Sequence, residues 1–381
     1  MVNIGKFFLS SALLMGTIIG AGIFGLPYVA AKSGIIPSFF YFLVLGGVSF
    51  LIHLFLGEIV LRTKEKQRLA GYAKRYLGGV GSSMVAFSIV LGTVLALVAY
   101  IIIGGRFLKI FLGFCLPFLN ITDFRLSLVF ALLLLPFLFR GIKNVAKTEF
   151  ISNILFGLII VFVFLFSLPN FDFNNFYLFN SSNIFLPYGV ILFSLTGWSA
   201  IPEMVEILNS DEDKKKLKKA IIFSIIAAIC IYLIFVLTVV GVSGSNTTEE
   251  TFVGLLPYLD SRIIFLGVLA GIITIADSFL ILSINLKNTL IYDYGISGFS
   301  SLFIAWALPI FLFLCGLRHF INVIGIAGTL IGAIEGIAII MIFKKAKSFG
   351  NRKPEYSINI SRFSEYVLIT LFVLGVISLI F

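Results

Sequence analysis

The chain has 381 residues, of which 60% are hydrophobic and only 12% are charged, whereas about 25% of the residues of a soluble domain are charged. This composition excludes a soluble protein, and apolar runs of about 20 residues predict membrane-spanning helices rather than the short alternating strands of a barrel. The formal net charge of +10 is not assigned to nucleic-acid binding, because membrane topology accounts for the basic residues.

Eleven apolar spans occupy most of the sequence, and we expect them to form one transmembrane domain, residues 1–381. Their approximate bounds are 8–30, 36–61, 82–111, 126–141, 149–168, 185–208, 219–243, 262–287, 297–316, 321–343 and 364–381. The expected fold class is an all-α integral membrane protein with about 11 transmembrane helices. The first span is too long for a cleavable signal peptide and has no small-residue cleavage site.

Four clusters of lysine and arginine follow the second, fourth, sixth and tenth spans. They comprise Arg62, Lys64, Lys66, Arg68, Lys74 and Arg75; Arg140, Lys143 and Lys147; Lys214, Lys215, Lys216, Lys218 and Lys219; and Lys344, Lys345, Lys347, Arg352 and Lys353. Such residues accumulate in cytoplasmic loops, and all four clusters fall on one side of the membrane. We therefore expect a multi-pass protein of the cytoplasmic membrane, with a cytoplasmic N-terminus and an external C-terminus.

The first span contains four glycines and a proline within the twelve residues from Gly16 to Pro27. Glycine in a helix interior costs about 1 kcal/mol relative to alanine, and proline removes a backbone donor. Non-helical backbone persists at membrane depth only where it lines a cavity. The stretch predicts either a helix broken at mid-membrane, whose bare N–H and C=O groups hold a solute, or a close packing face made by Gly20, Gly22 and Gly25.

A second irregularity interrupts the sixth span, where small and hydroxylated residues run from Ser194 to Gly197 and Pro202 follows. Two interrupted spans, five spans apart, are typical of an inverted-repeat transporter. We expect repeat one at about residues 8–168, repeat two at about 185–343 and one extra helix at about 364–381. Half-helix N-termini favour an anion and freed carbonyls favour an ammonium group or a cation, so an α-amino acid suits both breaks. This pattern favours the broken-helix interpretation of the first span.

Asp277 lies well inside the eighth span, with the hydroxyls of Thr274 and Ser278 close by in sequence. An acid at this depth costs at least about 2.5 kcal/mol on insertion scales and is a candidate functional residue. It could carry a proton or coordinate Na⁺; the alternative is a structural partner for a polar group on another span.

The other titratable residues of the spans receive mainly structural interpretations. Glu58 precedes Arg62 by four residues and is expected to pair with it. Glu203 is assigned to gating or helix capping, and Glu335 fits either an inner gate or a hydrogen bond between helices. His53 is expected to be a packing residue rather than a proton relay.

Four stretches of the sequence resemble the amino acid–polyamine–organocation transporter superfamily. They are TIIGAGIFGLPYVAAKSG in the first span, LGEIVLRT closing the second, FSLTGWSAIPEM in the sixth, and DSFLILSINLKNTLIYDYG leaving the eighth. The similarity covers nearly the whole chain and is nearest to the amino acid/auxin permease and aromatic amino acid (tryptophan/tyrosine) permease group. It implies the LeuT-type 5+5 inverted repeat, with broken helices 1 and 6, and transport by alternating access.

The same resemblance implies a set of substrate-binding residues. Backbone N–H groups of Gly20, Ala21 and Gly22 would take the substrate carboxylate. The ammonium group would be bound by carbonyls near Thr17 and Ile18 and by those of Phe193 and Ser194. Around them would lie Thr196 beside the site, Trp198 as a gate or lid, and Leu282 as a pocket wall.

A coupling cation is implied between the first and eighth spans. Its ligands would be the carbonyls of Gly16, Ile19 and Thr274 and the side chains of Asp277 and Ser278. Relatives often have a pair of hydroxyls where this chain has Asp277 and Ser278, and a carboxylate suits either H⁺ or Na⁺.

The predicted function is a secondary active transporter of amino acids, working by symport with H⁺ or Na⁺. The alternatives are a transporter of a polyamine or another organic cation, and an amino acid sensor or channel of the same fold that does not transport. No enzyme motif, phosphate loop or cofactor motif occurs in the sequence, and no metal is expected beyond Na⁺ at the coupling residues. The expected partners are the amino acid and the lipid bilayer.

Overall fold

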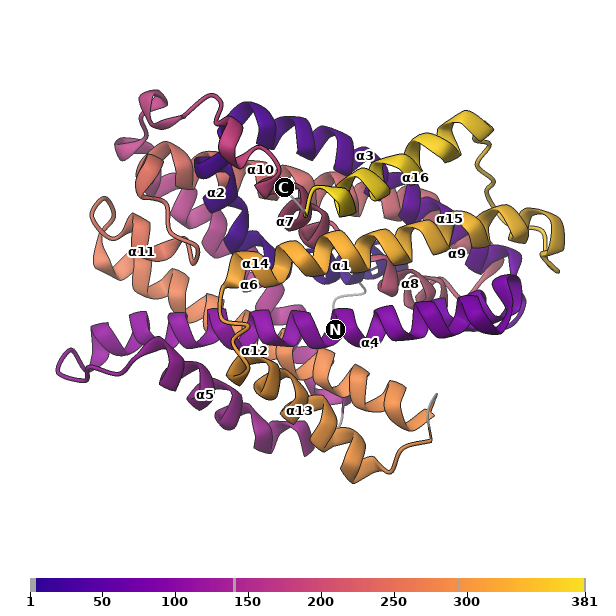
Figure 1. Ribbon diagram of the computed structural model, residues 1–381, viewed down its shortest axis with the longest axis horizontal. Coiled ribbons are helices and arrows are strands. Elements are labelled where there is room, and N and C mark those ends of the chain that lie inside the picture. The colour runs from indigo at the N-terminus through magenta and orange to yellow at the C-terminus, as the bar shows by residue number, and fades with distance from the viewer. Residues whose placement is uncertain (1–4, 140–141, 293–294, 380–381) are drawn as a thin grey trace.

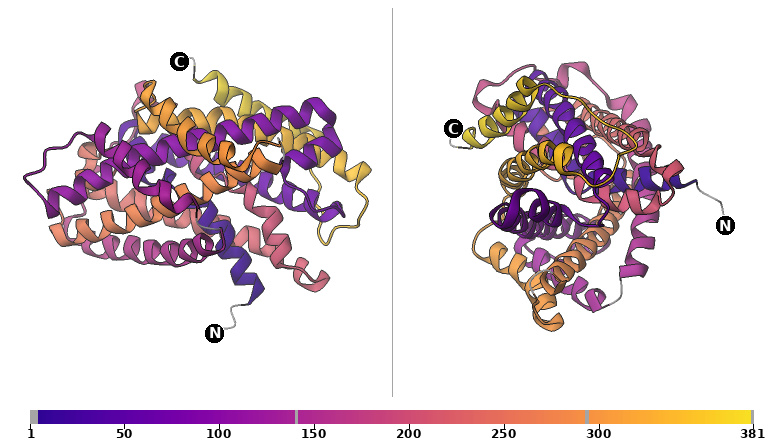
Figure 2. Two further views of the ribbon diagram at one scale, coloured as in Figure 1. Left: turned by 90° about the horizontal axis from the view of Figure 1, so that it is seen from below. Right: turned by 90° about the vertical axis from the view of Figure 1, so that its right-hand side faces the viewer.

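The regular elements are helical throughout the part of the chain described by the computed structural model, residues 5–139, 142–292 and 295–379 (Figure 1). The long helices run roughly along one axis, and the loops gather at its two ends (Figures 1 and 2). This arrangement confirms the expected all-α fold.

The first predicted span consists of two helices, α1 (Lys6–Ile18) and α2 (Gly22–Ser33), bent by 53°. In the break, the amide of Gly20 donates to the carbonyl of Ile18 at 2.9 Å, with Ile19 at φ −80° and ψ 78°. These are the features of an inverse γ-turn. The turn ends the helical ladder where the sequence predicts the break.

Two long helices and two shorter ones follow: α3 (Ile35–Arg62), α4 (Leu69–Cys115), α5 (Asp123–Leu134) and α6 (Ile142–Ser167). α4 begins well before the predicted bound of 82, because Gly78, at φ +84°, joins a basic segment to the membrane helix. Positive φ is readily adopted only by glycine. α5 gives way to the 3₁₀ turn η1 (Leu135–Phe139) around Pro136, which lacks a backbone donor.

The sixth span is divided into α7 (Leu186–Ser194), the 3₁₀ turn η5 (Trp198–Ala200) and α8 (Ile201–Ile207). Residues 195–197 separate the first two, and Gly197 is extended at φ −165°. The loop before α7 carries three 3₁₀ turns, η2 (Leu168–Asn170), η3 (Phe173–Asn175) and η4 (Ser181–Asn183). Both breaks of the expected LeuT-type fold are therefore present.

The remaining elements continue to the C-terminal helix. They are α9 (Asp211–Lys214), α10 (Leu217–Ser243), η6 (Gly244–Asn246), α11 (Phe252–Leu255), α12 (Ser261–Tyr292), α13 (Gly298–Leu314), α14 (Phe320–Ile326), the π turn η7 (Ala327–Ile331), α15 (Gly332–Phe349) and α16 (Arg362–Ile377).

The two broken spans pack on each other through both halves. α2 lies against α7, α1 lies against α8, and α10 packs on both α1 and α2. Around them, α12 contacts α4 and α6, and α15 contacts α3 and α4. The breaks therefore lie inside the bundle rather than at its lipid-facing surface.

The described basic loops gather at one end of the long axis. The segments after α3, α8 and α15 lie at the right of Figure 1, whereas α11 and the α4–α5 loop lie at the left, and Figure 2 shows the same separation.

Six helical stretches within the described residues, the interrupted stretch from α7 to α8 among them, are long and apolar enough to cross a membrane, and the bent α1–α2 pair makes a seventh such span. Each predicted span overlaps a helix or a broken pair, but α5, α13 and α16 are shorter than α3 or α12. The figure of eleven spans and the repeat boundaries stay predictions.

Candidate functional site

Tyr232, on α10, links the two helix breaks. Its hydroxyl lies 2.6 Å from the carbonyl oxygen of Ile18 and 2.9 Å from that of Ser194, which are the last residues of α1 and α7. The tyrosine is fully buried. Carbonyls at helix C-termini lack intrahelical partners and carry partial negative charge. One hydroxyl therefore serves the C-terminal ends of both half-helices, with its single proton shared between the two carbonyls.

Two glycines allow the breaks to approach each other this closely. A Cβ on Gly22 would lie 2.3 Å from Ser194 Oγ and 3.0 Å from Ser194 Cα, and a Cβ on Gly197 would lie 2.4 Å from Ile18 Cγ1. At Gly20 the nearest atom is the Tyr100 hydroxyl, 2.9 Å away. The glycines of the first span therefore lie at a helix break, and one of them, Gly22, also makes a close packing contact.

The N-terminal end of α2 presents free backbone amides. Gly20 donates to Ile18, Ile23 to Gly20 at 3.3 Å and Phe24 to Ala21 at 3.2 Å. Among the described residues, the amides of Ala21 and Gly22 have no backbone acceptor. Two adjacent N–H groups at the positive end of a twelve-residue helix form an arrangement that suits an anionic group.

Some carbonyls of the breaks already accept hydrogen bonds from donors of the chain itself. That of Ile18 accepts from Gly20 and from Tyr232. That of Phe193 accepts from the amide of Thr196 at 3.2 Å and from its hydroxyl at 2.7 Å. A carbonyl oxygen has two lone pairs, so these two are filled, whereas the Ser194 carbonyl accepts from Tyr232 alone among the described contacts.

The second break is also held from α3. Ser49 Oγ donates to the carbonyl of Leu195 at 2.8 Å. His53 is fully buried, its Nδ1 lies 2.7 Å from the carbonyl of Ser49, and its Nε2 has no hydrogen-bond partner within the described residues. The imidazole lies beside Trp198, with 5.7 Å between ring centroids.

Trp198 is buried and connects the sixth span to α15. Its indole N–H donates to the Glu335 carboxylate at 2.5 Å, which makes Glu335 a hydrogen-bonding partner between elements. The π turn η7 precedes Glu335, and a Cβ on Gly328 within it would lie 1.9 Å from the Gly189 carbonyl of α7. Single π turns recur at functional sites, and this one seats α14 and α15 directly on the sixth span.

The predicted coupling residues lie in α1, in the first break and on α12. Gly16 lies in α1 and Ile19 in the first break. Thr274, Asp277 and Ser278 lie on α12, together with the pocket-wall candidate Leu282. Thr274 is buried, and its hydroxyl has no partner among the described residues.

An aromatic cluster joins α2 to α4, α6 and α11. Phe24 of α2 lies 4.8 Å from Phe107, 5.5 Å from Phe156 and 6.1 Å from Phe252 between ring centroids. Thr251, at φ +68°, donates its hydroxyl to the carbonyl of Phe24 at 2.8 Å. The α11 segment is thus fastened to the first span.

An ion-pair cluster joins Arg106 of α4 to the loop before α11. Arg106 Nη1 lies 2.6 Å from a Glu249 oxygen and 3.5 Å from a Glu250 oxygen. Burial raises the pKa of the Glu250 carboxyl, and the Arg106 charge opposes this shift.

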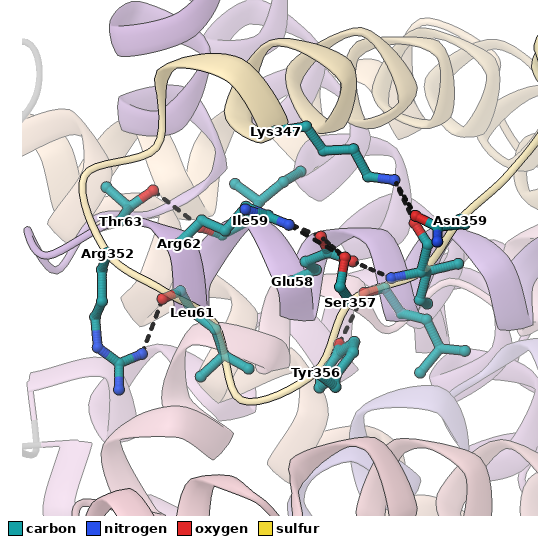
Figure 3. A network of polar contacts seen from close by, with 12 residues as sticks. Glu58, Ile59, Leu61, Arg62, Thr63, Lys347, Arg352, Tyr356, Ser357 and Asn359 are labelled. Atoms are coloured by element: carbon teal, nitrogen blue, oxygen red, sulfur yellow. Dashed lines mark hydrogen bonds and ion pairs between the residues drawn. The ribbon is translucent and has the colours of Figure 1, made fainter.

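Glu58 lies toward the end of α3 that carries the basic loops, where the predicted pair with Arg62 is confirmed at 2.7 Å. The fully buried carboxylate also accepts from Ser357 Oγ at 3.0 Å and from the Ile358 amide at 2.6 Å. Figure 3 shows residues 352–359 running along α3, with Tyr356 donating to the carbonyl of Leu54 at 2.8 Å. We call residues 351–361 the strap.

Glu203, predicted to act in gating or capping, forms an ion pair with Arg68. Near it lies a cavity of about 150 Å³, at the end of the molecule that carries the basic loops. Its walls include Thr63, Tyr72, Pro202 and Glu206.

A family model described as the tryptophan/tyrosine permease family matches residues 4–380. The chain belongs to the tryptophan/tyrosine permease family. This confirms the resemblance seen in the sequence, and it identifies an amino acid permease and a transporter rather than an enzyme.

Comparison with solved structures supports the fold of the permease. The crystal structure of MhsT in complex with L-phenylalanine matches it with a TM-score of 0.72 at 14% sequence identity, and the match covers 98% of each chain. At this identity the likeness shows the LeuT-type fold alone. The comparison with curated protein sequences gives no match.

Proposed function

We propose that the permease is a secondary active transporter that carries an amino acid across the cytoplasmic membrane by alternating access. The observation that supports this most strongly is the meeting of the two breaks. The free amides of Ala21 and Gly22 lie next to Ser194, because Gly22 packs directly on that residue. An α-carboxylate at these amides would therefore place its ammonium group near carbonyls at the C-terminal ends of α1 and α7.

The substrate contacts divide into two sets. The amides around Gly20, Ala21 and Gly22 take the carboxylate. The ammonium group donates to the second lone pair of the Ser194 carbonyl and to the carbonyl of Thr17. The carbonyls of Ile18 and Phe193 are left out because each already has two donors.

The side chain of the substrate is proposed to be aromatic. The description of the family names tryptophan and tyrosine, and the structurally similar MhsT was solved in complex with L-phenylalanine. Thr196, Trp198 and Leu282 are the proposed surroundings of this side chain, with Trp198 as the gate.

Coupling is proposed to use H⁺ or Na⁺ at Thr274, Asp277 and Ser278 of α12, together with the carbonyls of Gly16 and Ile19. An acid at membrane depth is a candidate functional residue, and a carboxylate suits either H⁺ or Na⁺. The gathering of basic loops at one end of the molecule supports a cytoplasmic assignment of that end, with the N-terminus inside.

The test is uptake of labelled L-tryptophan, L-tyrosine, L-phenylalanine and putrescine into proteoliposomes, under an imposed H⁺ or Na⁺ gradient in turn. We expect one aromatic amino acid to accumulate under one gradient, and to show counterflow when unlabelled substrate is inside. Accumulation of putrescine would instead identify an organic-cation transporter. Binding without counterflow would identify a sensor, and flux that neither saturates nor shows trans-stimulation would identify a channel.

A further inference from the structure

The Tyr232 hydroxyl is placed where two half-helices end, and no other side chain has that position in the described contacts. The carbonyls of Ile18 and Ser194 close α1 and α7, and both lie within 2.9 Å of this hydroxyl. Each is the negative end of a helix dipole. Two such ends facing one point repel each other unless a positive group lies between them.

In transporters built on broken helices, a coupling cation bound by unwound carbonyls and half-helix C-termini commonly meets this requirement. Here a polarised O–H bond meets it instead. The hydroxyl is carried by α10, which packs against α1 and α2, and the tyrosine has no exposed surface. The donor is therefore a permanent part of the bundle, whereas a bound cation exchanges with the solution.

We propose that the Tyr232 hydroxyl occupies the place of a cation between the C-terminal ends of α1 and α7, and thereby positions the substrate site. Tyr232 is a positioning residue, because it acts on the backbone that would bind substrate. The effect on substrate affinity rests on the proposed transport function. The position is distinct from the proposed coupling residues on α12.

The proposal predicts an unusual consequence of removing one oxygen atom. In Tyr232→Phe the two helix ends face each other across the space the hydroxyl leaves, and the Ser194 carbonyl loses the donor it has among the described contacts. A buried acceptor without a partner costs enough to lower affinity about tenfold. A small monovalent cation then becomes the replacement for the missing donor.

The experiment measures binding of labelled L-tryptophan, L-tyrosine and L-phenylalanine to purified protein, in sodium chloride and in choline chloride. We expect Tyr232→Phe to bind about tenfold more weakly than wild type in choline, and to recover at least half of the loss in sodium. The quantity compared is the ratio of the affinity in sodium to the affinity in choline. Dividing the ratio of the variant by that of wild type removes any sodium response that comes from the α12 residues, since both proteins share it.

Tyr188→Phe is the matched control. Tyr188 is a buried tyrosine on α7 whose hydroxyl donates to the carbonyl of Leu371 at 3.1 Å, so it loses the same kind of bond away from the breaks. Its sodium-to-choline ratio should equal that of wild type. Unchanged affinity in Tyr232→Phe, or a loss that sodium does not restore, overturns the proposal.

Thermal stability provides a readout independent of transport. The Tm of Tyr232→Phe should rise in sodium relative to choline, while those of Tyr188→Phe and wild type should not rise as much. Protein that folds in sodium alone supports the proposal, whereas protein that unfolds in both salts overturns it. If wild type binds none of the amino acids, the proposed function fails, and the Tm comparison still decides the role of Tyr232.

Discussion

At the scale of single residues, the helix breaks depend on two glycines that have no side chain and on one buried hydroxyl. Gly22 and Gly197 have no Cβ, so α2 and η5 come within contact of Ser194 and Ile18. The Tyr232 hydroxyl then joins the two breaks. The geometry of the candidate site therefore depends on close backbone approach and on one buried donor.

The neighbouring glycines should respond differently to alanine. Gly22→Ala places a methyl 2.3 Å from Ser194 Oγ and 3.0 Å from Ser194 Cα, and such overpacking costs about 1–3 kcal/mol. Gly20→Ala meets the end of the Tyr100 side chain, which can move. We expect at least a tenfold loss of amino acid affinity in Gly22→Ala and little change in Gly20→Ala, measured by binding to purified protein. The double variant Gly22→Ala/Ser194→Gly should regain part of the loss, and equal affinities in the two single variants would contradict the packing argument.

Asp277 allows a second test at this scale. If its carboxylate carries the coupling ion, Asp277→Asn should retain substrate exchange across the membrane and lose accumulation driven by a gradient. Both are measured in the same proteoliposomes, so exchange serves as the internal control for folding. Concentrative uptake at the wild-type level would remove Asp277 from the coupling role.

The sequence predicts the breaks but not the residues that hold them. Glycine and proline predict a break because each changes the local backbone, and the residues that mark one break lie close together in sequence. Tyr232 and Glu335 act on partners 38 or more positions away, at Ser194 and Trp198. A tyrosine in an apolar helix produces no local pattern, so the sequence alone could not pair it with two carbonyls.

At the scale of elements, the strap ties the end of α15 to α3. Its main anchor is the Glu58 carboxylate, which accepts three hydrogen bonds, one of them from the guanidinium of Arg62 (Figure 3). Local spacing predicts the Arg62 bond, four residues along the helix. The other two come from residues 299 and 300 positions later in the chain, which no helical periodicity could predict.

Glu58→Gln should release the strap. The substitution keeps the size of the side chain but removes the negative charge that the three donors share, and hydrogen bonds to charged groups contribute about 1.5–3 kcal/mol each. We expect a clear fall in Tm and faster proteolytic cleavage within residues 351–361. Ser357→Ala, which removes one donor, is the control with the smaller effect. Resistance to protease equal to wild type in Glu58→Gln would show that apolar contacts hold the strap.

At the scale of the whole molecule, the two ends differ. At the α11 end, Phe252 contacts Phe24 and Phe107, and Arg106 lies between two glutamates. The opposite end carries the basic loops and the cavity beside Pro202. Such asymmetry agrees with the proposed alternating access, in which the two ends open in turn.

Glu250 gives the α11 end a pH dependence. Burial raises the pKa of its carboxyl above the usual 4.5, so the folded state prefers the protonated form more than the unfolded state does. Its contribution to stability is complete below pH 4.5 and is lost as the pH rises through the raised value. We expect Glu250→Gln to increase the Tm at pH 7 and to match wild type near pH 4.5. Glu249→Gln, which removes the closer partner of Arg106, should lower the Tm at pH 7, and a lowered Tm for both variants would contradict the assignment.

The strap also has a consequence for the order in which the protein is made. Glu58 enters the membrane region with the second span, but Ser357 and Ile358 are synthesised about three hundred residues later. Until they arrive, Arg62 is the one partner of this acid that is already in the nascent chain among its described contacts. The set of hydrogen bonds on Glu58 is therefore completed only after α15 has been synthesised. A ribosome stalled after α15 would hold a bundle whose second span still has an incompletely paired charge.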